Sequence, residues 1–169
     1  RKRYEGYCTD IITDRALDWL KNQRDDNKPF VLMCQHKAPH RNWCPAPRHL
    51  NLFDDIVMPE PKTLFDSYGG NRSKTLKEHE MGIKDHMFWG WDMKFHGKDS
   101  MFPEHFVSGL ANREYQRMNE SQKEQWDKAY EPKNQKLIAG IQSGKLKGKG
   151  ITKWKYQRYI KDYLRTIKA

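Results

Sequence analysis

The sequence predicts an α/β fold, in which amphipathic helices pack against a sheet of buried parallel strands. Residues 10–21 carry apolar side chains at the spacing of one helix face, namely Ile12, Ala16, Trp19 and Leu20. Residues 30–34, Phe-Val-Leu-Met-Cys, form a continuous apolar run that is too short for a helix and does not alternate with polar residues. Such a run is typical of a strand buried on both faces of a parallel sheet.

The helix over residues 10–21 starts with residues that favour a helix N-terminus. Thr9 or Asp10 can cap it, and Asp10 and Asp14 lie where the helix dipole favours carboxylates. We therefore interpret these two acids as capping residues rather than as metal ligands.

A loop rich in prolines and polar groups, residues 35–49, follows the predicted strand. Its three prolines prevent a helix. Ligands of open α/β sheets bind just outside the carboxyl ends of the strands, so this loop is the strongest candidate site. His36 and His40 are four residues apart, but Pro39 between them removes the helix that would let the pair share a zinc ion.

Two helices are expected in the middle of the chain. Residues 76–93 carry an imperfect apolar stripe, which favours a helix packed through its Met and Trp side chains. A capping-box pattern from Ser121 to Glu124 predicts a short helix over residues 122–130.

Two more helices are expected near the end. Pro132 suits the first turn of a helix that ends near Gly140 or Gly144, and a flexible basic link follows. Residues 151–169 then form an amphipathic helix. Its apolar face consists of Trp154, Tyr156, Tyr159, Ile160, Tyr163, Leu164 and Ile167.

The net charge of +10 comes entirely from the end of the chain. Residues 133–169 contain eleven Lys or Arg and one acid, Asp162, whereas residues 1–132 contain 21 of each sign. A basic segment interleaved with aromatics can bind a polyanion, and a polyanion-binding module is our alternative hypothesis. However, the aromatics follow helical spacing and no nucleic-acid motif is present. We therefore expect no nucleic-acid partner and place most of this charge on the solvent face of a packed helix.

Composition argues against several other classes of protein. The chain has 169 residues and 21 aromatic side chains, six of them Trp, which is too many for a disordered chain. No run approaches the roughly 20 apolar residues that a membrane span requires. Cys8, Cys34 and Cys44 are odd in number and lack C-x-x-C spacing, which favours neither a disulfide framework nor a zinc ribbon.

Several motifs, in order along the chain, resemble the sulfatase family. The matching segments are Tyr7-Cys8-Thr9-Asp10, Lys28-Pro29-Phe30, Ala38-Pro39-His40, Pro61 to Asp66, and the terminal helix from Trp154 to Arg165. The Pro61–Asp66 segment resembles the bacterial branch, which includes enzymes that degrade polysaccharides and heparan-type glycosaminoglycans.

The resemblance implies an alkaline-phosphatase-like core, a formylglycine made in a Cys/Ser-x-Pro/Ala-x-Arg motif, and a calcium ion held by Asp and Asn side chains. Neither motif is identifiable; Cys44-Pro45-Ala46-Pro47-Arg48 has one residue too many before its arginine. We therefore expect residues 1–169 to be the central part of one sulfatase domain, with the calcium ligands elsewhere. Residues 1–49 would form a helix, core strand and active-site loop, 50–150 a helix-rich insertion, and 151–169 a helix returning to the core.

The resemblance implies that His40 lies at the sulfate, near the ester oxygen that leaves. A positioned imidazolium can donate a proton to that oxygen. Lys37 and Arg41 could offset the anionic substrate, and Trp43 could stack on a sugar ring. The alternatives are a His40 bonded to backbone, solvated cations, and a Trp43 packed under the loop.

We thus expect a sulfuric ester hydrolase that acts on sulfated carbohydrate in the periplasm or outside the cell. We expect residues 1–169 alone to be inactive, because the nucleophile and calcium motifs are missing. A related phosphatase or phosphonate hydrolase of the same superfamily stays open, because the nucleophile is not identified.

Overall fold

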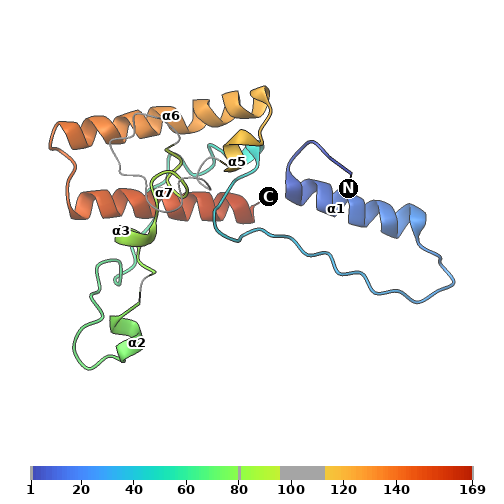
Figure 1. The fold of residues 1–169 in the computed structure, drawn as a ribbon, viewed down its shortest axis with the longest axis horizontal. Coiled ribbons are helices and arrows are strands. Elements are labelled where there is room, and N and C mark those ends of the chain that lie inside the picture. Colours follow the sequence, from blue (N-terminus) through green and yellow to red (C-terminus); the bar gives the residue numbers. More distant parts are fainter. Residues whose placement is uncertain (1, 80, 96–112, 169) are drawn as a thin grey trace.

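The computed structural model of the chain describes residues 2–79, 81–95 and 113–168. This part consists of helices joined by long irregular segments (Figure 1). The two longest helices, α6 (Glu120–Gln142) and α7 (Lys149–Ile167), run side by side, while α1 (Cys8–Asp18) lies apart from them (Figure 1). A long extended segment connects α1 to the rest of the molecule.

Helix α1 confirms the helix expected near the start of the chain, and a single π-helical turn, η1 (Trp19–Gln23), continues it. Its N-cap residue is Tyr7, and no side chain caps the helix. The prediction of Thr9 or Asp10 as the cap was therefore wrong. The Asp10 carboxylate instead accepts hydrogen bonds from Arg48 at 2.6 and 2.9 Å.

The prediction of a buried strand over residues 30–34 was wrong for the described structure, in which none of the described residues forms a strand. Val31 is 90% exposed and Met33 74% exposed. A strand needs a neighbouring strand to bond its backbone groups, and the described residues offer none. Phe30 packs instead on Trp19, with ring centroids 5.3 Å apart. The described part of the chain is thus helix-rich, and it does not contain the sheet that the α/β prediction requires.

The helix expected over residues 76–93 was also wrong. Two short helices, α2 (Lys74–Lys77) and α3 (Ile83–His86), take its place, and turns follow up to Phe95. Gly82 adopts an extended conformation directly before α3, and a glycine inside a helix costs about 1 kcal/mol relative to alanine. Glu80, between the two short helices, lies outside the described residues.

A short helix, α5 (Arg113–Gln116), precedes α6. The cap of α6 is Asn119, whose side chain accepts from Gln122 N at 2.8 Å while Gln122 Oε1 accepts from Asn119 N at 3.0 Å. The capping box predicted from Ser121 to Glu124 was therefore wrong in register.

Pro132 lies inside α6 rather than at the start of a second helix, so the predicted boundary there was wrong as well. Proline removes one helical hydrogen bond. The side chains of Tyr130, Asn134 and Leu137, on either side of Pro132, are all buried. Their packing keeps the helix continuous at Pro132 despite the missing hydrogen bond.

Helix α7 confirms the terminal amphipathic helix, but the face that it buries was not the one expected. Its predicted apolar face is mostly half-buried. Its buried residues are Thr152, Lys155, Arg158, Asp162, Arg165 and Thr166. The expectation that the basic residues of this helix face the solvent was thus wrong for Lys155, Arg158 and Arg165, since each is buried and donates to a carbonyl or carboxylate oxygen.

The core has two apolar clusters along α6. One contains Leu50, Trp126, Ala129 and Tyr130, and the other Met93, Phe95 and Leu137. The segment that carries Met93 is held from both long helices. Asn134 of α6 donates to Lys94 O at 3.0 Å, and Arg158 of α7 donates to Met93 O at 3.1 Å.

We expect Leu137→Ala to lower the free energy of unfolding by about 2–5 kcal/mol, because it opens a cavity between this segment and α6. Leu137 is 1% exposed. Urea unfolding of the complete protein measures the loss. Ile167→Ala, at a side chain that is 51% exposed, is the matched control and should change stability by less than about 0.5 kcal/mol. Equal losses in the two variants would contradict this packing.

Candidate functional site

The loop after the extended segment places His40 at the surface. His40 N donates to Lys37 O at 2.8 Å, which closes a tight turn, and both side chains are exposed. His40 Nδ1 lies within hydrogen-bond distance of Arg41 O. A carbonyl oxygen only accepts, so Nδ1 carries the hydrogen and Nε2 is left to face a ligand. The turn therefore leaves one defined ring nitrogen, Nε2, without a partner in this hydrogen bond.

Trp43 supports this turn from the inside. Its side chain is 8% exposed, and Nε1 donates to Pro39 O at 2.9 Å. Its ring packs edge-on against Tyr159 and Tyr163 of α7, with centroids 4.7 and 6.2 Å apart. The indole thus packs under the loop, as one of the two alternatives for Trp43 expected.

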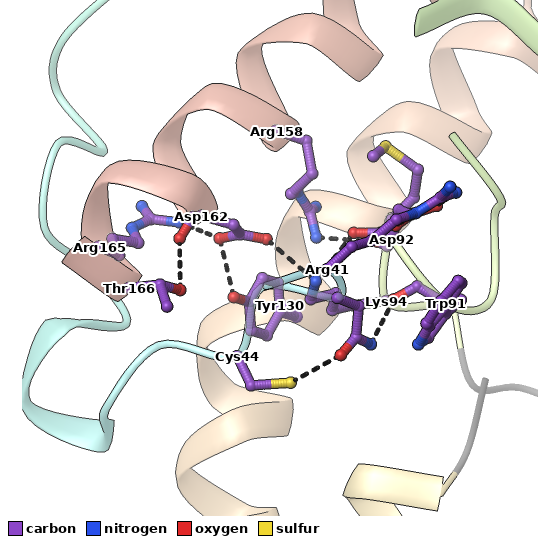
Figure 2. Close-up of polar contacts among 12 residues, drawn as sticks. Arg41, Cys44, Trp91, Asp92, Lys94, Tyr130, Arg158, Asp162, Arg165 and Thr166 are labelled. Carbon is purple, nitrogen blue, oxygen red and sulfur yellow. Dashed lines mark hydrogen bonds and ion pairs between the residues drawn. The ribbon is translucent and has the colours of Figure 1, made fainter. Parts of the chain in front are cut away.

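The side chain of Arg41 is held by contacts with residues more than forty positions further along the chain. Its Nε donates to Asp92 Oδ1 at 2.8 Å, and its Nη2 contacts Asp92 Oδ2; Figure 2 shows the two residues side by side. Nη2 also contacts His86 O. The guanidinium carbon also lies 5.0 Å from the centre of the Phe88 ring and 4.8 Å from that of Trp91. The residue expected to bind substrate therefore already has a buried carboxylate partner.

Asp92, the partner of the predicted site residue Arg41, was not singled out from the sequence. It is 1% exposed, and its Oδ2 also accepts from Phe88 N at 2.7 Å. One signal was present: Asp92 is the single acid in an aromatic-rich run from Met87 to Met93, where an unpaired carboxylate would be costly.

A second buried polar group connects α6, α7 and the segment around Lys94. Asp162 Oδ1 accepts from Tyr130 Oη and from Arg165 Nη1, both at 2.9 Å (Figure 2). Asp162 Oδ2 lies 3.7 Å from Lys94 Nζ. Arg165 Nη2 also donates to Asp54 at 2.6 Å. Burial, and then the charge of Asp162, raises the pKa of the Tyr130 hydroxyl.

Cys44 does not have the environment of a nucleophile. Its Sγ donates to Asn42 Oδ1 at 3.3 Å, and burial raises the pKa of the thiol to about 11. A reactive cysteine needs a lowered pKa, because the thiolate is the attacking species. Cys44 therefore stays a protonated thiol near neutral pH.

The described residues do not provide a calcium site of the kind that the resemblance implies. No group of three or more His, Cys, Asp or Glu side chains in residues 2–79, 81–95 and 113–168 is arranged to hold a metal ion. Two carboxylates that contact the loop, those of Asp10 and Asp92, are both paired with arginines. No catalytic step is therefore assigned to a metal held by these residues.

No family model matches the chain. It is 44% identical over 165 residues to the N-acetylglucosamine-6-O-sulfatase of Bacteroides thetaiotaomicron, an alignment that covers 98% of the chain. The chain belongs to the sulfatase family. An arylsulfatase of Volvox carteri is 30% identical over 100 residues, which cover 48% of the chain and 14% of that enzyme. The resemblance found in the separate motifs is thus confirmed along nearly the whole chain.

A solved structure gives the same assignment from the fold. This structure is of a protein in complex with its substrate, D-glucosamine-2-N,6-O-disulfate. The match covers 97% of the 169-residue chain, with a TM-score of 0.79 and 44% sequence identity. The chain spans only 28% of the length of the Bacteroides relative and 32% of that structure. In the described part, no helix is both long enough and apolar enough to cross a membrane.

Proposed function

We propose that this sulfatase removes the 6-O-sulfate from a glucosamine unit of a sulfated carbohydrate. The observation that carries the proposal is the 44% identity, over 165 residues, to an enzyme named for that reaction. The substrate in the matching solved structure is also a glucosamine with a 6-O-sulfate. A sulfated polysaccharide is too large to cross a bilayer unaided, which supports a place in the periplasm or outside the cell.

In the proposed reaction, His40 assists the departure of the sugar oxygen. Cleavage of the S–O bond builds negative charge on that oxygen, and the imidazolium Nε2–H can donate its proton there as the bond breaks. The exposure of the His40 side chain and the hydrogen bond from Nδ1 to Arg41 O support this role.

Lys37 is the proposed cation for the sulfate, because it lies exposed in the same turn as His40. Arg41 and Trp43 contribute to the site in this proposal mainly by shaping the turn, since their polar groups bond to Asp92 and Pro39. A formylglycine nucleophile and a calcium ion, which other sulfatases use, would come from residues other than those described.

The polyanion-binding alternative loses support from the structure of α7. Lys155, Arg158 and Arg165 are buried and are bonded to protein oxygen atoms, so this helix does not present an unbroken basic face.

The test is sulfate release by the complete protein as it is made in the cell. We expect inorganic sulfate from N-acetylglucosamine 6-sulfate and from glucosamine 2-N,6-O-disulfate, measured by ion chromatography. Glucosamine 2-N-sulfate, which lacks the 6-O-ester, should release none. Faster release of phosphate from glucosamine 6-phosphate would favour the phosphatase alternative, and release of neither anion would contradict both hypotheses.

A further inference from the structure

We infer that Asp92 is a positioning residue that acts through Arg41 to hold the imidazole of His40 toward the substrate. This inference rests on the proposed function for its effect on catalysis. The structural part, that Asp92 controls the orientation of His40, is independent of which ester the enzyme cleaves.

Both carboxylate oxygens of Asp92 are used to hold the protein chain around Arg41. Asp92 receives Arg41 Nε on Oδ1, and Arg41 Nη2 and Phe88 N on Oδ2. The side chain is fully buried, whereas that of Arg41 is 18% exposed. A two-pronged arginine–carboxylate pair fixes both the distance and the plane of the guanidinium, which a single hydrogen bond does not. The position of Arg41 is thus determined from the interior.

Hydrogen bonds also connect both sequence neighbours of Arg41 to this arrangement. The carbonyl oxygen of Arg41 is the group that accepts from His40 Nδ1. On the other side, Asn42 Nδ2 donates to Trp91 O at 3.1 Å. The residues at positions 41 and 42 are therefore both tied to the same turn at Phe88–Asp92. Moving Arg41 necessarily moves the acceptor that selects the tautomer of His40.

Asp92 supplies a rigid support that the turn of His40 does not have by itself. The turn of His40 is at the surface and has few apolar side chains of its own to pack. An acid–base group acts only when its reactive atom is held in the correct geometry, and a shift of about 1 Å can reduce the rate by on the order of 10²-fold. A buried carboxylate that anchors the next residue supplies this geometry without occupying the site itself.

The test compares two substrates in the complete enzyme. In Asp92→Asn, which keeps the shape of the side chain but removes the charge, we expect kcat for the sugar 6-sulfate to fall by about 10²-fold, with KM changed by less than about 3-fold. Nitrophenyl sulfate, whose leaving group needs little proton donation, should lose much less activity. Arg41→Lys keeps a cation but not the two-pronged geometry, and should behave in the same way. Asp85→Asn, on α3 with an exposed carboxylate, is the matched control and should retain normal turnover.

A double variant separates positioning from general damage to the fold. If Asp92 acts through His40, adding Asp92→Asn to His40→Ala should lower kcat no further. Losses that multiply, or equal losses on both substrates, would overturn the inference.

A readout that does not depend on activity completes the test. Histidine side-chain ¹⁵N spectra of the complete enzyme, recorded at a pH where the ring is neutral, should show His40 as the Nδ1–H tautomer, and Asp92→Asn should shift its signals toward a mixture of tautomers. Unchanged His40 signals in Asp92→Asn would overturn the inference even in an enzyme that is active. An enzyme that releases no sulfate from any substrate would instead contradict the proposed function, and the spectra would still decide the role of Asp92.

Discussion

Replacing His40 with alanine is expected to lower kcat for the sugar 6-sulfate by about 10²–10⁴-fold, which is the usual contribution of a general acid or base. The His40 side chain is exposed, and its ring forms a hydrogen bond with the carbonyl oxygen of Arg41. The fold should therefore be unchanged, and circular dichroism and thermal unfolding of the complete protein should match those of the wild type. Steady-state kinetics with N-acetylglucosamine 6-sulfate measure the effect.

His36→Ala is the matched control for this experiment. His36 is also an exposed histidine, four residues earlier, and its ring lies near Thr13 and Cys34 rather than in the turn. We expect it to retain activity within about 3-fold, as surface substitutions away from the chemistry usually do. Turnover of His40→Ala close to that of the wild type would remove His40 from the mechanism.

Replacing Asp162 with alanine is expected to lower the free energy of unfolding by about 3–5 kcal/mol, because it leaves buried positive charges without their partner. Lys94 and Arg165 both face this carboxylate and are 1% exposed, and the buried hydroxyl of Tyr130 donates to it. Urea unfolding of the complete protein, followed by fluorescence, measures the loss. Asp162→Asn keeps an acceptor for Tyr130 and isolates the contribution of the charge.

Asp55→Asn is the control for the loss of one negative charge. Asp55 is exposed, next to Asp54 in sequence, and its replacement should change stability by less than about 0.5 kcal/mol. A stability for Asp162→Ala within 1 kcal/mol of the wild type would show that the cations between α6 and α7 are compensated in another way.

The helices that could be predicted are those whose signal is local. The apolar spacing around Trp19 and around Tyr159 fits one helix face, and α1 and α7 form there. Boundaries were harder, because they depend on competition between neighbours. Asn119 rather than Ser121 caps α6, and packing carries that helix through Pro132.

The failed strand and the missed aspartate have the same physical cause. A strand at residues 30–34 needs partners that are far from it in sequence, and the described residues do not contain them. Asp92 is connected to the His40 turn only because Arg41, 51 positions earlier, bonds to it. Neither relation leaves a periodic pattern in the nearby sequence.

By itself, the sequence determined the two helices α1 and α7, the loop that carries His40, and the sulfatase family, because helical periodicity and short motifs are properties of neighbouring residues. The tertiary structure decided which groups are buried. From the sequence, Arg158 and Arg165 were expected to face the solvent. In the structure, Arg158 donates hydrogen bonds to oxygens of Asn134 and Met93, and Arg165 donates to oxygens of Asp162 and Asp54. Burying a charge is costly until partners from other segments surround it, and only the folded chain brings those partners together.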